Sequence, residues 1–553
     1  MSPRRLWPTR PVPAELSARY AEQGWWDDRS LGRLLSDRLA EIGTLEFRVW
    51  SATRPWRGTM DDVHGLARRF AGALAARGVG AGDVVAMQLP NCVEAAVVFW
   101  GTALAGAGVV PIVHFYGPRE VGFILGQVDP DVVVVSGPFG PVDPSATLAA
   151  CSDVWSPGPR GAGPGDRCVA VVDLEVPAPS LDGWLDAAPI GPADVDVTSP
   201  ALVAFTSGTT ASPKGVMHTH RTLGAEVRQL GAVQPPGGAP LLTGAPVGHA
   251  IGMLSGLLLP AERGQAVHLI DVWDPAAVLA AMSEADVNAG SGATFFLQSL
   301  LDHPDCGPDH LARMGHVGLG GSSVPRSFTD RVVALGLSVT RSYGSTEHPS
   351  TTGASFDEPQ ERRAATDGRA LPGVELRVVD PDRDDGAVVD VPPGTPGEIW
   401  SRGPDLFAGY TDPELTAAAV TDGGWFRTGD IGVLDPDGWL TITDRLKDVI
   451  IRGGENVSAA EVESELLAVP GVAEVAVVAG PDARLGERPV AFVRAVPGAE
   501  PPTLDAVRRH LRDVGLARQK WPEELVVVDD LPRTPSGKVR KVDLRARLHP
   551  PAL

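Results

Sequence analysis

Apolar runs alternate with helically spaced apolar residues along the first quarter of the chain. Three short runs are mostly apolar, and the segment that begins at Thr59 places Leu66, Phe70 and Leu74 on one face of a helix. We therefore expect strands at 84–89, 109–113 and 131–135, and helices at 59–78, 93–104 and 121–128. Strands that alternate with helices at this spacing are typical of a largely parallel sheet with helices on its faces.

The pattern changes twice in the later part of the chain. A second alternating block covers 201–343, and between 368 and 439 short apolar runs are broken by glycine, proline and aspartate, as in a small barrel. The tail has apolar residues of its own and predicts a small α+β domain with strands at 472–478 and 525–528. The expected fold is α/β, with two doubly wound sheets plus a small β-barrel in a large N-terminal domain. The expected domains are 1–446, divided near 1–195, 196–345 and 346–446, and 447–553.

Composition narrows the classes of function. With 553 residues, of which 43% are hydrophobic, the chain has material for about three to four domain-sized units. The formal net charge of −21 disfavours non-specific nucleic-acid binding, because no excess of cations is available to displace counterions. The four cysteines lie far apart and lack metal-ligand spacing, which favours a reducing, cytoplasmic location.

Two uncharged runs, 95–111 and 241–260, are long enough to be weighed as membrane spans. Both contain glycine and proline, and a buried helix followed by a buried strand explains the first run better. The arginines near the N-terminus have no apolar stretch behind them, so we expect no secretory signal. These features predict a soluble protein with no membrane span.

The loop at 206–215 carries the strongest local sign of chemistry. It follows an apolar run at 201–205 and reads Thr-Ser-Gly-Thr-Thr-Ala-Ser-Pro-Lys-Gly. Small hydroxyl residues and glycines leave backbone N–H groups open, and Lys214 adds a compact positive charge, which together suit a polyphosphate. The order of residues is not that of a Walker loop. The alternative is a solvent-exposed loop rich in serine, threonine and glycine.

Further stretches combine hydroxyl, carboxylate or basic side chains with glycines. They lie at 320–325, 343–347, 425–430, 444–448, 452–456 and 532–538. Each one alone fits a turn or a solvated charge cluster. In this order, and together with the loop at 206–215, they resemble the adenylate-forming superfamily of acyl-CoA synthetases, adenylation domains and luciferases. The resemblance covers nearly the whole chain and implies ATP, Mg²⁺ and coenzyme A as cofactors.

The resemblance also implies a role for each matching residue. It assigns Glu347 to Mg²⁺, Lys538 to catalysis, and Lys447 to a hinge about which a mobile C-terminal domain rotates between adenylation and thioester formation. The β- and γ-phosphates of ATP would be held by Thr206, Ser207, Gly208, Thr209, Thr210 and Lys214. The rest of the nucleotide would contact Ser322, Ser323, Pro325, Tyr343, Gly344, Thr346, Asp430 and Arg445. The pantetheine tunnel of coenzyme A would be lined by Gly453, Gly454, Glu455 and Asn456.

The acid itself is less determined. Adenylation domains for amino acids use an aspartate in the stretch that matches 246–252, and this chain has none there, which disfavours an α-amino acid. His249 resembles a histidine near the substrate carboxylate or the thiol, although it is also compatible with a core histidine. An apolar acid pocket is expected from Met253, Phe295, Phe296, Gly318 and Leu319.

These inferences predict an ATP-dependent carboxylate–CoA ligase for a fatty, alicyclic or aromatic acid, acting through an acyl-AMP. One alternative loads the acyl group onto a carrier protein. Another is a non-catalytic nucleotide-binding protein that descends from the same fold. Either a monomer or a homodimer is compatible with the sequence.

Overall fold

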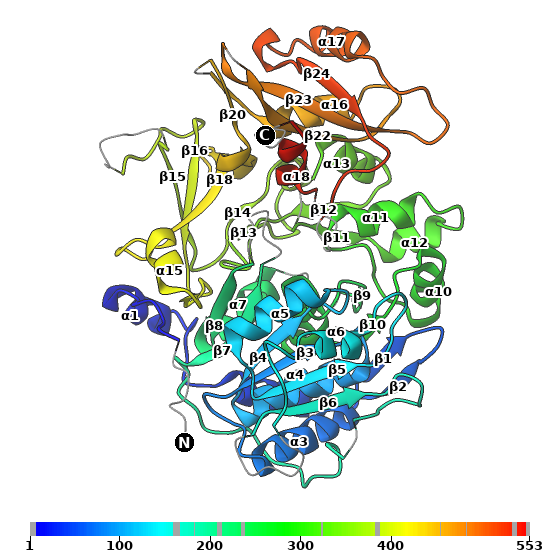
Figure 1. Ribbon diagram of the computed structural model, residues 1–553, viewed down its shortest axis with the longest axis vertical. Coiled ribbons are helices and arrows are strands. Elements are labelled where there is room, and N and C mark those ends of the chain that lie inside the picture. The colour runs from blue at the N-terminus through cyan, green and yellow to red at the C-terminus, as the bar shows by residue number, and fades with distance from the viewer. Residues whose placement is uncertain are drawn as a thin grey trace.

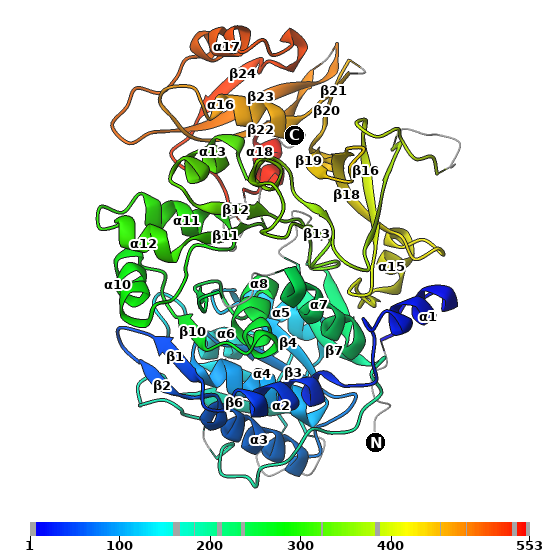
Figure 2. The ribbon, with the colours of Figure 1, turned by 180° about the vertical axis from the view of Figure 1, so that it is seen from behind.

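The computed structural model has a large body and a smaller C-terminal part, as the two opposite views in Figures 1 and 2 show. The orange and red C-terminal elements lie at one end, and the blue and cyan N-terminal elements form the other end. The structure describes residues 7–158, 166–181, 183–206, 213–233, 238–321, 324–381, 388–453, 455–482, 484–533 and 539–548.

The central sheet has seven strands in the order β17, β8, β7, β4, β3, β5, β6. From β7 to β6 the neighbours are parallel, whereas β8 and β17 are antiparallel to their neighbours. Because helices cover both faces, strands such as β5 are buried along their whole length and need no polar alternation. The strands are β3 (Val84–Gln88), β4 (Gly108–Ile112), β5 (Val132–Ser136), β6 (Cys168–Val172), β7 (Pro200–Phe205), β8 (Gly215–Thr219) and β17 (Gly409–Tyr410).

The helices expected near this sheet are confirmed. Thr59 caps α3 through a reciprocal capping box with Asp62. Every residue of α4 is buried, which explains why the first uncharged run continues from this helix into β4. The helices of this region are α1 (Ala14–Glu22), α2 (Leu31–Glu41), α3 (Met60–Ala76), α4 (Val93–Ala105), α5 (Pro118–Val128), α6 (Pro144–Ala150) and α7 (His220–Val233).

A second sheet has the order β2, β1, β10, β9, and isolated bridges continue from it towards the pair β11 and β12. Strands from both sides of residue 195 therefore share each of the two large sheets. The strands are β1 (Glu46–Trp50), β2 (Trp56–Thr59), β9 (Leu242–Thr243), β10 (Val267–Ile270), β11 (His316–Leu319) and β12 (Ser338–Arg341). The helices are α8 (Ala250–Met253), the π-helical turn η1 (Leu254–Leu258), α9 (Leu259–Arg263), α10 (Pro275–Ala285), α11 (Thr294–Leu301), α12 (Pro308–Arg313) and α13 (Arg326–Ala334). Among the described residues, no helix has the length and apolar character needed to cross a membrane.

The region expected to be a barrel is an antiparallel sheet in the order β15, β16, β18, β19. A separate pair of short strands, β13 and β14, lies beside it, and closure into a barrel stays a prediction. The elements are β13 (Thr352–Gly353), α14 (Gln360–Ala365), β14 (Arg369–Ala370), β15 (Glu375–Val379), β16 (Pro396–Arg402), α15 (Pro413–Ala419), β18 (Phe426–Leu434) and β19 (Leu440–Arg445).

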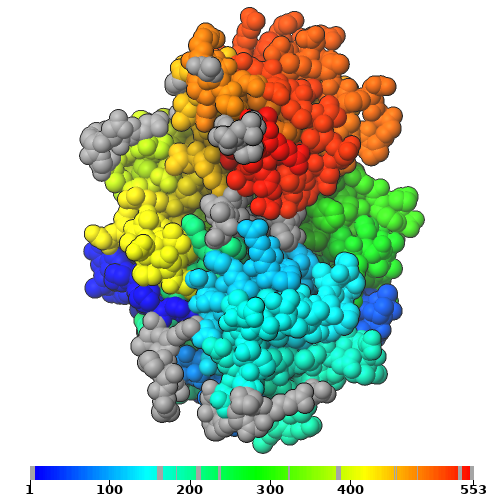
Figure 3. Space-filling view, in the orientation of Figure 1, coloured from blue at the N-terminus to red at the C-terminus, as the bar shows by residue number. Residues whose placement is uncertain are grey.

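The C-terminal part is the expected α+β unit, with its own apolar core. Its sheet has the order β21, β20, β23, β22, with β24 parallel to β23. The elements are the 3₁₀ turn η2 (Leu446–Asp448), β20 (Ile450–Arg452), β21 (Glu455–Val457), α16 (Ala459–Leu466), β22 (Val472–Asp482), β23 (Gly486–Ala495), α17 (Leu504–Asp513), the 3₁₀ turn η3 (Arg518–Lys520), β24 (Glu524–Val527) and α18 (Lys541–Leu548). In Figure 3 this part covers the end of the larger body, next to its yellow and green residues.

Candidate active site

A cleft of about 1470 Å³ is lined by residues that lie between Thr206 and Lys447 in the sequence. Its walls come from the β7–β8 hairpin, from α8 and η1, from the loop after β12, and from the β18–β19 hairpin with η2. Of the residues singled out in the sequence, it is lined by Thr206, Lys214, His249, Phe296, Gly318, Gly344, Thr346, Glu347, Asp430, Arg445 and Lys447.

Glu347 stands at a tight turn and is held from two directions. The Tyr410 hydroxyl donates to its carboxylate at 2.7 Å, and the N–H of Phe407 donates to its carbonyl at 2.8 Å. The turn closes because the N–H of Ser345 donates to the carbonyl of His348 at 3.0 Å. Burial, and then the neighbouring Glu347, raise the pKa of Tyr410, so this hydroxyl remains a hydrogen-bond donor at neutral pH.

Gly344 is required for the same turn. A Cβ on this residue would lie 1.9 Å from the carbonyl oxygen of Pro349, so any other side chain would force the turn open. On the opposite side of Thr346, the imidazole of His218 donates to its carbonyl at 2.8 Å. Burial lowers the pKa of His218 to about 4, so the ring is neutral at physiological pH. Thr346 and Glu347 are therefore presented to the cleft on a fixed backbone.

Lys214 begins the second arm of the β7–β8 hairpin. The hairpin closes through hydrogen bonds between Thr206 and Lys214, from the N–H of Thr206 to the Lys214 carbonyl at 3.0 Å and from the N–H of Lys214 to the Thr206 hydroxyl at 3.3 Å. The ammonium of Lys214 lies 4.9 Å from the centre of the Tyr410 ring. The cation therefore lies beside the tyrosine that contacts Glu347.

Asp430 is a second carboxylate of the cleft that is held from two directions. It lies opposite Arg445 in the pairing of β18 with β19, and the two side chains form an ion pair at 2.9 Å. The Tyr343 hydroxyl donates to its other oxygen at 2.6 Å. The Asp430 carboxylate raises the pKa of Arg445, while burial, followed by Asp430, raises the pKa of Tyr343. Two donors thus fix the orientation of the carboxylate.

The apolar residues that line one part of the cleft, here called the apolar arm, differ in part from the expected pocket. Phe296 and Gly318 line it. Met253 is buried beside a separate small cavity, Leu319 lies in the hydrophobic core, and Phe295 is 63% exposed. The arm instead includes Trp273, whose ring packs 4.6 Å from that of Phe296 and lies where a Cβ on Gly244 would clash.

Comparison with known proteins gives the family of the chain. The model of the "AMP-binding enzyme" family matches residues 50–411, and the model of the "AMP-binding enzyme C-terminal domain" matches residues 461–538. The chain belongs to the AMP-binding enzyme family. Both matches agree with the division of the structure into a large body and a small C-terminal part.

Relatives within this family match the chain along nearly its full length. The medium-chain fatty-acid–CoA ligase of Escherichia coli (strain K12) is 32% identical over 96% of this chain and 92% of its own. The 3-[(3aS,4S,7aS)-7a-methyl-1,5-dioxo-octahydro-1H-inden-4-yl]propanoyl:CoA ligase of Rhodococcus jostii (strain RHA1) is 35% identical over 88% and 93%, respectively. The crystal structure of ATP-bound MatB from Rhodopseudomonas palustris superposes with a TM-score of 0.81 at 28% identity, covering 93% of this chain and 98% of that one.

Several residues expected from the motifs of the AMP-binding enzyme family are not placed in the cleft. Pro325 precedes α13 outside the cleft, and Gly453 and Glu455 lie in the β20–β21 hairpin, also outside it. Asn456 pairs with Ile451 in the same hairpin, and its side chain lies outside the described part of the structure. Ser207, Gly208, Thr209, Thr210, Ser322, Ser323, Gly454 and Lys538 also lie outside the described residues.

Other site residues were not singled out in the sequence. Tyr410 and Glu226 line the cleft, and the imidazole of His218 contacts the Thr346 carbonyl. Only the folded chain brings these groups together. The one local sign is that Tyr410 ends the run Arg402-Gly403-Pro404-Asp405-Leu406-Phe407-Ala408-Gly409-Tyr410, in which arginine, proline and glycine residues interrupt an apolar stretch.

The chemistry of the described residues fits a magnesium ion that is shared with substrate. No cluster of three or more metal-binding side chains exists among the described residues, so a cage made only of protein is not formed by them. Mg²⁺ commonly binds through one or two carboxylates together with substrate phosphates and water. Glu347 supplies one carboxylate at the cleft wall, and only one of its oxygens receives the Tyr410 hydroxyl.

Proposed function

We propose that this enzyme activates a fatty, alicyclic or aromatic carboxylic acid with ATP and transfers the acyl group to coenzyme A. The observation that carries the proposal is the convergence of Lys214, Glu347 and Asp430 with an apolar arm in one cleft. The family and the full-length relatives support the reaction class, an ATP-dependent acid–CoA ligation that passes through an acyl-AMP.

The apolar arm of the cleft favours an apolar substrate. Besides Trp273 and Phe296, its walls include Ile251, Leu254 and Leu259. Glu226 also lines the cleft and lies with Leu254 beside a small adjoining cavity, and its carboxyl group accepts the Ser350 hydroxyl at 2.7 Å. Burial, and then Asp405, raise the pKa of Glu226 far above its usual value, so Glu226 is not a counter-ion for a substrate ammonium group. Glu226 therefore does not weigh against the inference from 246–252 that the substrate is not an α-amino acid.

In the first step the substrate carboxylate attacks the α-phosphorus, a new O–P bond forms, and the bond to pyrophosphate breaks. No side chain need act as a nucleophile, so positioning and charge stabilisation supply the rate. We assign the ribose hydroxyls to Asp430, the polyphosphate to Lys214, and the α-phosphate to Thr346. Bound at Glu347, Mg²⁺ would neutralise charge on the phosphate oxygens. In the second step the thiol of coenzyme A attacks the acyl carbon, and AMP leaves.

We also propose that the C-terminal domain, 447–553, turns about Lys447 between the two steps. The Lys447 side chain lines the cleft, and burial, followed by the charge of Arg445, lowers its pKa. Lys538 is assigned the stabilisation of the first transition state. Lys538→Ala is therefore expected to abolish acyl-AMP formation and to spare thioester formation from supplied acyl-AMP. Equal loss of both steps in single-turnover assays would contradict this role.

The remaining assignments concern surroundings and partners. The four cysteines are free thiols, which supports a reducing, cytoplasmic location. Free coenzyme A is proposed as the acceptor in preference to a carrier protein, and the oligomeric state as monomer or homodimer.

The decisive experiment is a panel of fatty, alicyclic and aromatic acids, assayed for ATP-dependent pyrophosphate release with and without coenzyme A. We expect release with at least one apolar acid and a CoA thioester when the thiol is present. Release that leads to a thioester only with a phosphopantetheinylated carrier protein would replace the acceptor. Absence of release with every acid would leave a nucleotide-binding protein and overturn the proposal.

A further inference from the structure

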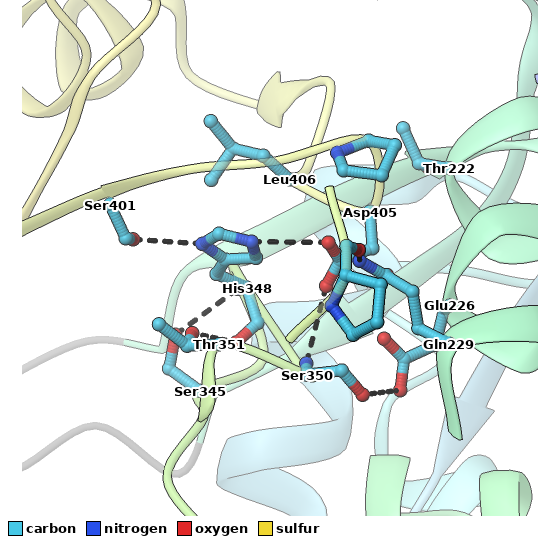
Figure 4. A network of polar contacts seen from close by, with 12 residues as sticks. Thr222, Glu226, Gln229, Ser345, His348, Ser350, Thr351, Ser401, Asp405 and Leu406 are labelled. Atoms are coloured by element: carbon cyan, nitrogen blue, oxygen red, sulfur yellow. Dashed lines mark hydrogen bonds and ion pairs between the residues drawn. The ribbon is translucent and has the colours of Figure 1, made fainter. Parts of the chain in front are cut away.

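A buried polar cluster lies directly beneath the turn that carries Glu347. It is centred on His348 and Asp405, whose side chains are 1% and 0% exposed. Figure 4 shows the imidazole of His348 between Ser401 and Asp405, with Glu226 and Ser350 at the far end of the cluster. None of these residues belongs to the motifs that identified the family, although His348 directly follows Glu347 in the sequence.

The contacts of His348 connect two segments that are distant in sequence. Its Nε2 lies 3.1 Å from a carboxylate oxygen of Asp405, and its Nδ1 lies 2.8 Å from the Ser401 hydroxyl. Because a carboxylate only accepts hydrogen bonds, Nε2 carries the proton of the first contact. The other Asp405 oxygen accepts the N–H of Ser350 at 3.2 Å. The Asp405 carboxylate therefore binds the Glu347 turn at two points, immediately after Glu347.

The segment that contains Asp405 also holds Glu347 itself. Phe407 and Tyr410 contact the carbonyl and the carboxylate of Glu347, at 2.8 Å and 2.7 Å. One short segment, 405–410, thus holds Glu347 in three ways. Phe407 binds its backbone, Tyr410 binds its side chain, and Asp405 binds the next residue, His348. The cluster extends to helix α7 through the hydrogen bond from Ser350 to Glu226.

The glycine pattern shows that the space for His348 is specific. A Cβ on Gly403 would lie 2.8 Å from the His348 Nε2, so the chain passes the imidazole only because residue 403 has no side chain. A purely apolar core would fill this space without buried charges and without hydrogen-bonding requirements. A buried pair that loses one partner leaves the other uncompensated, which makes the geometry of the cluster all-or-none.

We propose that His348 and Asp405 are positioning residues for Glu347, which set the direction of its carboxylate towards the metal and the α-phosphate. The inference rests on the proposed function, in which Glu347 binds Mg²⁺. Groups that orient a metal ligand from behind change metal affinity or activity by about 10- to 100-fold when they are replaced. A merely structural pair would change stability and leave the metal affinity of the folded protein unchanged.

The test compares Asp405→Asn and His348→Leu with His348→Gln, whose amide N–H can still reach Asp405. Mn²⁺ binding is measured by electron paramagnetic resonance in the presence of α,β-methylene-ATP, and analogue binding is measured separately in EDTA. We expect Asp405→Asn and His348→Leu to raise the Mn²⁺ dissociation constant about tenfold or more, with a smaller change for His348→Gln. Analogue binding in EDTA should stay close to wild type, because Asp430 and its partners Tyr343 and Arg445 make no contact with His348 or Asp405.

The matched control is Glu94→Gln, which disrupts another buried ion pair. Glu94 lies on helix α4 and pairs with Arg54 at 2.6 Å. It does not line the cleft. This variant should lower the thermal midpoint without changing Mn²⁺ affinity. If Asp405→Asn unfolds the protein, His348→Gln against His348→Leu carries the same comparison.

The outcomes separate the two hypotheses. Wild-type Mn²⁺ affinity in Asp405→Asn and His348→Leu, or an equal loss in Glu94→Gln, would overturn the positioning role while the proposed function stands. If Glu347→Gln itself binds Mn²⁺ like the wild type, the metal assignment in the proposed function fails instead. A loss that is shared by Glu347→Gln, Asp405→Asn and His348→Leu, and is absent from Glu94→Gln, supports both.

Discussion

At the scale of single residues, two tyrosines hold the two carboxylates on which the proposed chemistry depends. Tyr343 donates to Asp430, and Tyr410 donates to Glu347. The chain has only four tyrosines, so half of them lie against cleft carboxylates. At Glu347 the hydroxyl donor keeps the carboxylate oriented without neutralising its charge, whereas Asp430 also forms an ion pair with Arg445.

Replacement of Asp430 by Asn tests the ribose assignment. The variant keeps one acceptor oxygen but loses the charge, and with it the strong hydrogen bonds that two ligand hydroxyls would make. A hydrogen bond to a charged group contributes about 1.5–3 kcal/mol, so the KM for ATP is expected to rise about 10- to 100-fold. Steady-state pyrophosphate release at saturating acid measures this change. The KM for the acid is the internal control, and an unaltered KM for ATP would remove the assignment.

Gly344→Ala tests whether the tight turn places Thr346 and Glu347. The new methyl group would meet the Pro349 carbonyl oxygen at 1.9 Å, so the turn must open and both side chains move. We expect pyrophosphate release to fall at least about tenfold, since a displacement of about 1 Å at a reacting group has effects of this order or larger. Gly65→Ala is the control, because this helical glycine has open space around its Cβ position. Wild-type activity in Gly344→Ala would contradict the explanation by close approach in the turn.

The residues of the acid pocket could be predicted only in part from the sequence. Phe295 and Phe296 are adjacent in the chain, and both were expected in the pocket. They lie on α11, where successive side chains point about 100° apart, so Phe296 lines the cleft while Phe295 is exposed. Motif residues such as Glu347 and Asp430 were predictable because a fixed order of polar residues identifies them. Pocket walls depend on the packing of distant segments, which leaves no local pattern.

At the scale of elements, hairpin register explains why Asp430 faces Arg445. Asp430 and Arg445 are separated by the turn between β18 and β19, and the antiparallel register puts them directly opposite each other.

The local elements of the first sheet, including β5 and α4, were predictable from their apolar runs. The edge strand β17 was not, because it consists of Gly409 and Tyr410 and pairs with β8 across a long stretch of sequence.

The element that joins the two domains gives a prediction of its own. Lys447 lies in the 3₁₀ turn η2, and its carbonyl accepts a hydrogen bond from Arg545 of α18 at 3.2 Å. Lys447→Pro fixes one backbone dihedral and restricts the preceding residue, so a rotation about this position is hindered. We expect acyl-AMP formation to stay within about twofold of wild type, and thioester formation to fall by about tenfold or more.

Single-turnover assays of the two half-reactions measure the effect separately. Lys447→Ala is the matched control, because it removes the same side chain and leaves the backbone free to rotate. The hinge assignment would be wrong if both variants reduced the two steps equally, or if Lys447→Pro turned over at the wild-type rate.

At the scale of the whole molecule, buried histidines contribute to the response to acid. Burial lowers the pKa of each of these histidines to about 4, and they are His114, His218, His220 and His268. An unfolded histidine binds its proton near pH 6.5. Between pH 6.5 and 4 the unfolded chain therefore binds protons that the folded chain does not, and stability decreases as the pH falls through this window.

His268→Gln isolates one of these contributions. The indole N–H of Trp50 donates to the His268 Nδ1 at 3.3 Å, so protonation of that nitrogen would place two donors face to face within the second sheet. A glutamine carbonyl can accept the same N–H and does not titrate. The free energy of unfolding of the variant should fall less steeply between pH 6 and 4.5, by about 1.4 kcal/mol per pH unit at most. Urea denaturation at pH 8, where both side chains are neutral, measures the packing change alone. If the stability curves of the variant and the wild type are parallel below pH 6, His268 does not contribute to the loss of stability in acid.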